Sequence, residues 1–180
     1  MNHGSKLLET QEKYGRLIQQ HYFEDVLFSF QWWFLLIIFI LVWAVWMIVS
    51  DKRRLNTILL AGFFPTVMAT IMDEIGLLLH LWSYSYHLLP FTVESYSINF
   101  SIIPVGYMLL YQYARKWKTF LIILAVLTAF AVIVAEPVFE FLGIYNLHTW
   151  KHVYSAPIYF LMAVITKWLV DKLAGKENNT

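Results

Sequence analysis

The chain contains stretches of about twenty almost entirely apolar residues, and these stretches constrain its fold more than any other feature. A helix of this length crosses the hydrocarbon core of a bilayer. The clearest example is 30–50, because no charged residue lies between Asp25 and Asp51. With 59% hydrophobic and only 14% charged residues, a soluble protein of 180 residues could not bury this apolar surface in its own core.

We therefore predict an all-α, polytopic membrane helix bundle with about five transmembrane helices. An amphipathic helix is expected before the first span, because apolar residues recur there at helical spacing. This helix lies either on the outer membrane surface or against the outer loops. The spans are expected at 30–50, 55–82, 97–114, 119–142 and 153–170. The predicted organisation is an amphipathic N-terminal segment (1–29), a five-helix transmembrane domain (30–170) and a short cytoplasmic tail (171–180).

The distribution of Lys and Arg predicts the orientation. Alternate loops and tails hold nine of these residues on one side of the membrane and four on the other. The positive-inside rule places the nine in the cytoplasm, so the N-terminus faces out and the C-terminus faces in. We expect a multipass plasma-membrane protein whose partner is the lipid bilayer. A net charge of +1 without a basic patch argues against nucleic-acid binding, and the lack of cysteine excludes thiolate chemistry.

Four carboxylates interrupt the apolar spans and are the strongest indication of a site. A charged side chain at the centre of a membrane helix costs roughly 2.5–3.5 kcal/mol, so such groups face the interior of a bundle. Glu136 and Glu140 are four residues apart and share one helix face. Pro137 lies between them and favours an irregular helix there. We predict one polar pocket in the outer half of the bundle, to which the third span adds Asn99; its members are Asp73, Glu74, His80, Glu136, Glu140, His148 and His152.

Four roles for this pocket remain open from the residues alone, and no catalytic residue is assigned. The carboxylates and histidines could have a purely structural role and hold the helices together. They could form a proton or ion relay, for which so small a bundle would need to be a homodimer. They could bind a small ligand or an ion, such as a divalent metal with Glu136, Glu140, His148 and His152 as candidate ligands. They could provide acid catalysis for a membrane enzyme acting on a lipid or isoprenoid.

One segment carries a family resemblance. The stretch from Glu136 to Tyr159 reads EPVFEFLGIYNLHTWKHVYSAPIY. Together with the acidic pair Asp73 and Glu74, it resembles the C-terminal segment of an uncharacterised family of small multipass membrane proteins from endospore-forming Gram-positive bacteria. The resemblance implies a bacterial plasma-membrane location and no particular activity. The acidic, proline-containing fourth span is also faintly similar to small membrane carotenoid cyclases, as an analogy only.

Overall fold

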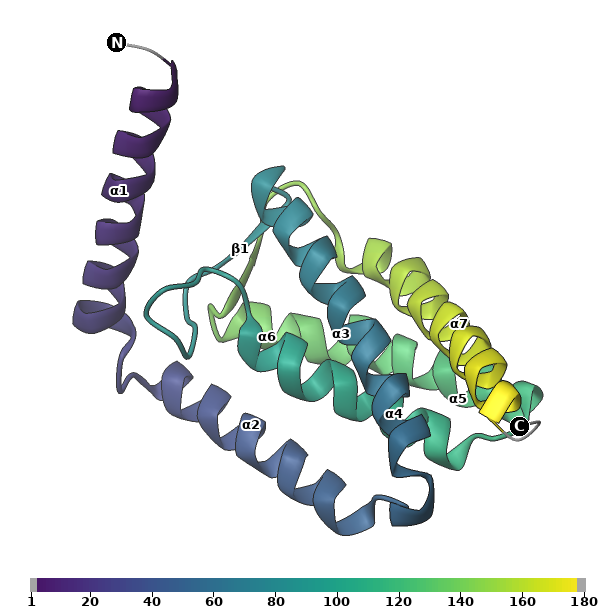
Figure 1. The fold of residues 1–180 in the computed structure, drawn as a ribbon. Coiled ribbons are helices and arrows are strands. Elements are labelled where there is room, and N and C mark those ends of the chain that lie inside the picture. The colour runs from purple at the N-terminus through teal and green to yellow at the C-terminus, as the bar shows by residue number, and fades with distance from the viewer. Residues whose placement is uncertain (1–2, 178–180) are drawn as a thin grey trace.

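The structure is a computed structural model that describes residues 3–177, and it is built almost entirely of helices (Figure 1). Two π-helical turns, η3 (Ile98–Ile102) and η4 (Ala131–Ala135), lead directly into α4 and α6. The helices are α1 (His3–His21), α2 (Phe30–Val49), α3 (Leu55–Leu78), α4 (Ile103–Tyr113), α5 (Trp117–Phe130), α6 (Glu136–Phe141) and α7 (His152–Glu177), and the strands are β1 (Trp82–Tyr84) and β2 (Tyr145–Leu147).

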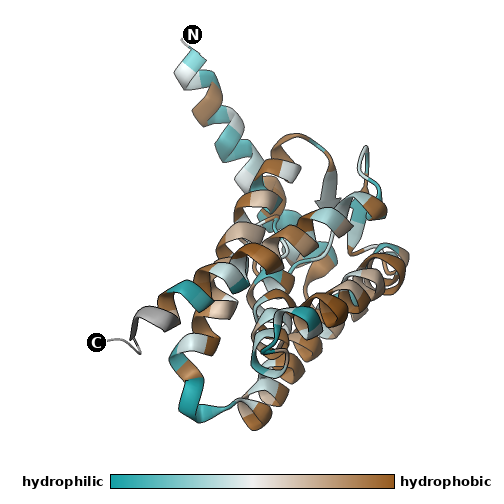
Figure 2. Ribbon diagram, turned by 90° about the vertical axis from the view of Figure 1, so that its right-hand side faces the viewer, coloured by the Kyte–Doolittle hydropathy of each residue, from teal (hydrophilic) through white to brown (hydrophobic). Residues whose placement is uncertain are grey.

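The predicted all-α bundle is confirmed. Within the described residues, four helical stretches are long and apolar enough to cross a membrane: Phe30–Val49, Lys52–Leu78, Trp117–Phe141 and His152–Ala174. The helix expected at 97–114 forms as five residues of η3 followed by eleven of α4, and is therefore shorter than the others. Figure 2 shows hydrophobic residues over most of the bundle and hydrophilic ones on α1 and near the C-terminus.

Helix α3 lies at the centre and packs against α4 and α7, while α5 packs on the other side of α7. Close approach of α3 and α4 depends on Gly62, where a Cβ atom would lie 2.8 Å from the side chain of Met108. Helix α2 packs against η3 and α4, and its first turns reach α6 through the ring pair Phe34–Phe139. This packing leaves α4 and α5 in limited contact with each other.

Helix α1 projects away from the bundle (Figure 1). None of its residues is buried, and its apolar side chains, such as Leu7 and Leu17, are exposed. Its last residue contacts a loop, because His21 Nε2 lies 3.1 Å from the backbone oxygen of Ser85. At the other end of the chain, α7 continues through the start of the predicted tail as far as Glu177, and 178–180 lie outside the described residues.

Strands β1 and β2 pair antiparallel and join two loops that are far apart in the sequence. The register places Trp82 opposite Leu147 and Tyr84 opposite Tyr145. We call the end of the bundle that carries these strands the strand end, and the end that carries Lys52–Arg54 the basic end. Helix α3 finishes at the strand end and α7 begins there, so side chains from both elements meet beneath the strands.

Candidate functional site

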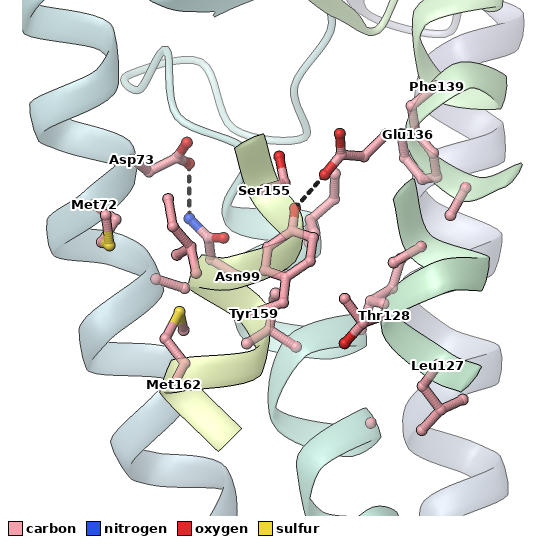
Figure 3. A pocket seen from close by; sticks show the side chains of 18 of the residues that line it. Met72, Asp73, Asn99, Leu127, Thr128, Glu136, Phe139, Ser155, Tyr159 and Met162 are labelled. Carbon is pink, nitrogen blue, oxygen red and sulfur yellow. Dashed lines mark hydrogen bonds between the residues drawn. The ribbon is translucent and has the colours of Figure 1, made fainter. Parts of the chain in front are cut away.

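A cavity of about 400 Å³ lies between α3, α4, α5–α6 and α7. This volume falls in the range of small-molecule sites in proteins. Most of its wall is apolar, including Met72, Leu127 and Met162 (Figure 3). The carboxyl groups of Asp73 and Glu136 lie on opposite walls toward the strand end (Figure 3). The cavity therefore has an apolar body and one polar end.

Asp73 is buried, with 5% of its surface exposed, and three side chains donate hydrogen bonds to it. Its Oδ1 accepts from Trp82 Nε1 at 3.0 Å and from Tyr84 Oη at 2.8 Å. Its Oδ2 accepts from Asn99 Nδ2 at 2.8 Å. Buried polar groups require such partners, and bonds to a charged acceptor are the stronger ones. The donors come from β1 and η3, so this carboxylate joins three parts of the chain.

The contact between Trp82 and Asp73 depends on a glycine one turn further along α3. A Cβ atom on Gly76 would lie 2.1 Å from Cζ2 of the Trp82 ring, far inside van der Waals distance. The bare helix surface at Gly76 therefore lets the indole lie against α3, where its Nε1 reaches the carboxylate. Helical glycine destabilises relative to alanine by roughly 0.5–1 kcal/mol, and here the close approach of the ring explains its presence.

Tyr84 and Tyr145 are kept in their protonated form. Burial, followed by the negative charge of Asp73, raises the pKa of Tyr84 well above its ordinary value. Burial, followed by the charge of Glu136, likewise raises the pKa of Tyr145. The two rings stack at the strand pair with centroids 5.5 Å apart. Tyr84 thus remains a hydrogen-bond donor at any physiological pH.

Glu136 has a different set of partners. Its Oε1 accepts a hydrogen bond of 2.6 Å from Tyr159 Oη, and its Oε2 lies 2.8 Å from His152 Nδ1. The other ring nitrogen, His152 Nε2, lies 2.8 Å from an oxygen of Glu140. The Glu136 side chain is 10% exposed and that of Glu140 is 45% exposed. One imidazole therefore connects a carboxylate in the cavity wall with one at the surface.

The local backbone explains how Glu136 reaches the cavity. Pro137 cannot donate a backbone hydrogen bond to the preceding turn. The turn before α6 is π-helical over Ala131–Ala135, which is the irregularity expected there. Extra residues in a helical turn rotate the following side chains around the axis, and such turns are frequent at functional sites. Both Ala131 and Ala135 line the cavity together with Glu136.

The cavity wall is open between α4 and α5. Gly106 lines it, and a Cβ atom there would meet nothing within 4 Å. On the facing helix, Leu127 is 44% and Phe130 57% exposed. Thr128 Oγ1 lies buried in the wall with no hydrogen-bond partner among the residues described. The opening thus lies among exposed apolar side chains, beside the apolar body of the cavity.

The residues of the predicted pocket are placed in three ways. Two of them line the cavity, a third bonds to one of these two, and a fourth bonds to the third. The others point elsewhere: Glu74 is exposed, about 100° around the helix from its neighbour. His80 is exposed just past the end of α3 with a φ of 53°. His148 is exposed and bonds to Ser83 Oγ at 3.0 Å. The cavity set is Asp73 and Glu136, the bonded set is His152 and Glu140, and the outer set is Glu74, His80 and His148.

The two carboxylates of the cavity form separate clusters. Helix α7 packs against α3 and also against η4, the turn that precedes α6. Asp73 and Glu136 therefore face each other across the cavity through different partners (Figure 3). Among residues 3–177, no group of three or more His, Asp or Glu side chains is placed to hold a metal ion. Both nitrogens of His152, a candidate ligand, are already bonded to carboxylates.

The aromatic partners of the carboxylates are residues of the candidate site that the sequence did not predict. Trp82, Tyr84 and Tyr159 are absent from the predicted pocket, since rings near the ends of membrane helices are commonly anchors in the headgroup layer. A signal was present for Tyr159, because it lies seven residues after His152 and so shares its helix face. The donors on β1 had no such signal, since the strand pairing itself was not predicted.

Family models, curated proteins and solved structures were all compared with the chain, and none of the three comparisons gave a match.

Proposed function

We propose that this membrane protein binds a lipid-soluble molecule with one oxygen-bearing end, a hydroxyl or carbonyl, in the cavity between α3, α4, α5–α6 and α7. The observation that carries the proposal is the shape of the cavity: an apolar body with a lateral opening at Gly106 and two hydrogen-bonded carboxylates at one end. The apolar body would hold a hydrocarbon or isoprenoid chain, and the polar end would orient it.

The polar end must supply most of the selectivity. A ligand that enters from lipid leaves surroundings as apolar as the cavity wall, so burial of its chain contributes little. Hydrogen bonds between groups in a membrane contribute about 0.6 kcal/mol on average, with a maximum near 1.7 kcal/mol. Bonds to a charged acceptor contribute about 1.5–3 kcal/mol. A hydroxyl at Asp73 or Glu136 would therefore be distinguished from a hydrocarbon of equal length.

The hydrogen-bond network favours this proposal over transport of ions across the membrane. The bonded chain from Glu140 ends inside the cavity at Tyr159, and among the described residues no side-chain hydrogen bond continues it from there to the basic end. A purely structural role accounts for the partners of the carboxylates and leaves the open cavity beside them unexplained.

We also propose a plasma-membrane location with the strand end outside and the basic end in the cytoplasm. The support is the distribution of Lys and Arg together with the alternating direction of the spans. Membership of the uncharacterised bacterial family is a proposal that rests on the segment from Glu136 to Tyr159 and on the acidic pair in α3.

The test is photolabelling of the full-length protein in lipid nanodiscs with a long-chain alcohol that carries a diazirine. We expect labelled peptides from the cavity wall, around Leu127 on α5 and Met162 on α7. Unlabelled alcohol should compete several-fold better than an alkane of the same length, because only the alcohol can bond at the polar end.

The matched variants are Gly106→Phe and Ala129→Phe. A side chain at Gly106 enters open space at the cavity mouth, so Gly106→Phe should fold normally and reduce capture at the cavity wall several-fold. Ala129 is exposed on α5 and does not line the cavity, so Ala129→Phe should leave capture unchanged. Equal labelling of both variants, or equal competition by the alkane, would overturn the proposal.

A further inference from the structure

The groups around Glu136 form a continuous line from the surface to the cavity. Glu140 is 45% exposed at the strand end, His152 is 21% exposed, and Glu136 is 10% exposed. The links from Glu140 to His152 and from His152 to Glu136 are both 2.8 Å, and Tyr159 closes the line at 2.6 Å. Exposure falls at each step while the bonds stay short.

This arrangement differs in kind from the one at Asp73. The partners of Asp73 are an indole, a phenol and an amide, which donate hydrogen bonds and do not exchange protons near neutral pH. The partner of Glu136 is an imidazole, the side chain that gains and loses protons most readily in that range. When two carboxylates in one cavity have different surroundings, they commonly have different roles.

We propose that Glu140, His152 and Glu136 carry protons between the water at the strand end and the cavity, so that Glu136 exchanges a proton with the polar end of a bound ligand. This inference deepens the proposed function, on which its ligand step rests. Asp73 serves in it as a fixed acceptor that positions the ligand. Because protons reach Glu136 from the water at the strand end, the site is suited to acid–base chemistry on the ligand.

The transfer balances in protons and charge. Glu140 takes a proton from water and passes it to His152 Nε2, while the proton on His152 Nδ1 moves to Oε2 of Glu136. One proton enters at Glu140, one arrives at Glu136, and the imidazole is neutral before and after. The reverse transfer returns the proton to water. Reorientation of the ring restores the first tautomer between successive transfers in the same direction.

The remaining titratable groups near Glu136 do not interrupt this path. From α7, Tyr159 donates to Glu136, and from β2, Tyr145 lies close enough to feel its charge. From α3, Asp73 adds a second negative charge across the cavity. The described part of the chain places no Lys or Arg within an ion-pair distance of Glu136.

The test measures proton exchange at Glu136 directly. Full-length protein in nanodiscs without added ligand is transferred from H₂O to D₂O, and infrared spectroscopy follows the carbonyl band of protonated carboxyl groups. The band that disappears in Glu136→Gln belongs to Glu136. The spectra are recorded at a series of pH values. The isotope shift of this band should appear at least about tenfold more slowly in His152→Gln, because the imidazole carries the transfer.

Two further variants keep the test decisive. Glu140→Gln changes an exposed side chain and should fold, yet should also slow the exchange. His148→Gln changes an exposed histidine at the same end, whose side chain bonds to Ser83 Oγ and to neither carboxylate of the line in the described structure, and it should leave the rate unchanged. No Glu136 band at any pH, or equal rates in wild type, His152→Gln and Glu140→Gln, would overturn the proposal. Since no ligand is present, this result and the photolabelling result stand or fall separately.

Discussion

Replacing Gly76 by alanine should destabilise the protein, against the usual effect of this substitution. In an exposed helix interior alanine is more favourable than glycine by about 0.8–1.0 kcal/mol. Here the new Cβ atom would lie 2.1, 2.3 and 2.5 Å from three ring carbons of Trp82. Ordinary carbon contacts begin near 3.5 Å, so the indole must move by more than about 1 Å.

That movement breaks a specific bond. Trp82 Nε1 lies 3.0 Å from Asp73 Oδ1, and a shift of this size takes it beyond hydrogen-bond distance. Loss of a bond to a charged acceptor costs about 1.5–3 kcal/mol. After the gain in helix propensity is subtracted, Gly76→Ala should lower the free energy of unfolding by about 0.5–2 kcal/mol.

The assay is a double-mutant cycle with Trp82→Val, read from reversible unfolding in mixed micelles. Valine suits a strand and has no atoms where the indole meets Gly76. In that background Gly76→Ala should become stabilising, by up to about 1 kcal/mol. The control is Gly106→Ala, which meets open space and should not change sign between the two backgrounds. If Gly76→Ala has the same sign and size in the wild-type and Trp82→Val backgrounds, the argument from the ring contact is refuted.

Three other perturbations follow from the loops and from η3, and each is read from the same unfolding assay. Burial, then the neighbouring Glu74, raises the pKa of Glu94 from 4.5 to about 7. The contribution of Glu94 to stability is therefore complete below pH 4.5 and is lost as pH rises through 7. Glu94→Gln should remove this dependence of the free energy of unfolding on pH, and an unchanged dependence would contradict the assignment to Glu94. Burial, then the charge of His21, lowers the pKa of His87 from 6.5 to about 4, so up to about 3 kcal/mol of stability is lost as pH falls from 6.5 through 4. His87→Leu should abolish that loss and raise stability near neutral pH, because both ring nitrogens are buried without hydrogen bonds in the described structure. Asn99→Leu removes one of the donors to Asp73 and should cost about 1–3 kcal/mol, a value near zero being incompatible with the bonding of that carboxylate.

Much of the bundle could be predicted because apolar length and charge are local properties. The helices at 30–50, 55–82 and 119–142 follow from composition alone, and their observed bounds differ by a few residues. The segment at 97–114 is harder to predict, because buried polar residues, Ser97, Asn99 and Ser101, lie at its start and it contains the π-helical turn η3. Hydropathy does not distinguish a full span from a shorter helix that is sheltered by its neighbours.

The candidate site could be predicted only in part. Charge in an apolar helix identified Asp73 and Glu136, because a buried carboxylate needs polar neighbours wherever it lies. Which neighbours it has depends on loop geometry, and the pairing of β1 with β2 supplies Trp82 and Tyr84. The predicted pocket includes His80 together with Asp73, yet α3 ends at Leu78 and His80 is exposed at the surface.

The short strand pair also has a consequence for how the protein is made. Trp82 and Tyr84 leave the ribosome directly after α3, whereas Tyr145, which stacks on Tyr84, follows about sixty residues later, after α4, α5 and α6. In a nascent chain that has inserted only its first half, the surroundings of the Asp73 carboxylate are therefore still incomplete. The pair of β1 and β2 at the strand end of the cavity can form only when the loop that carries β2 has emerged, so it forms late in the synthesis of the protein.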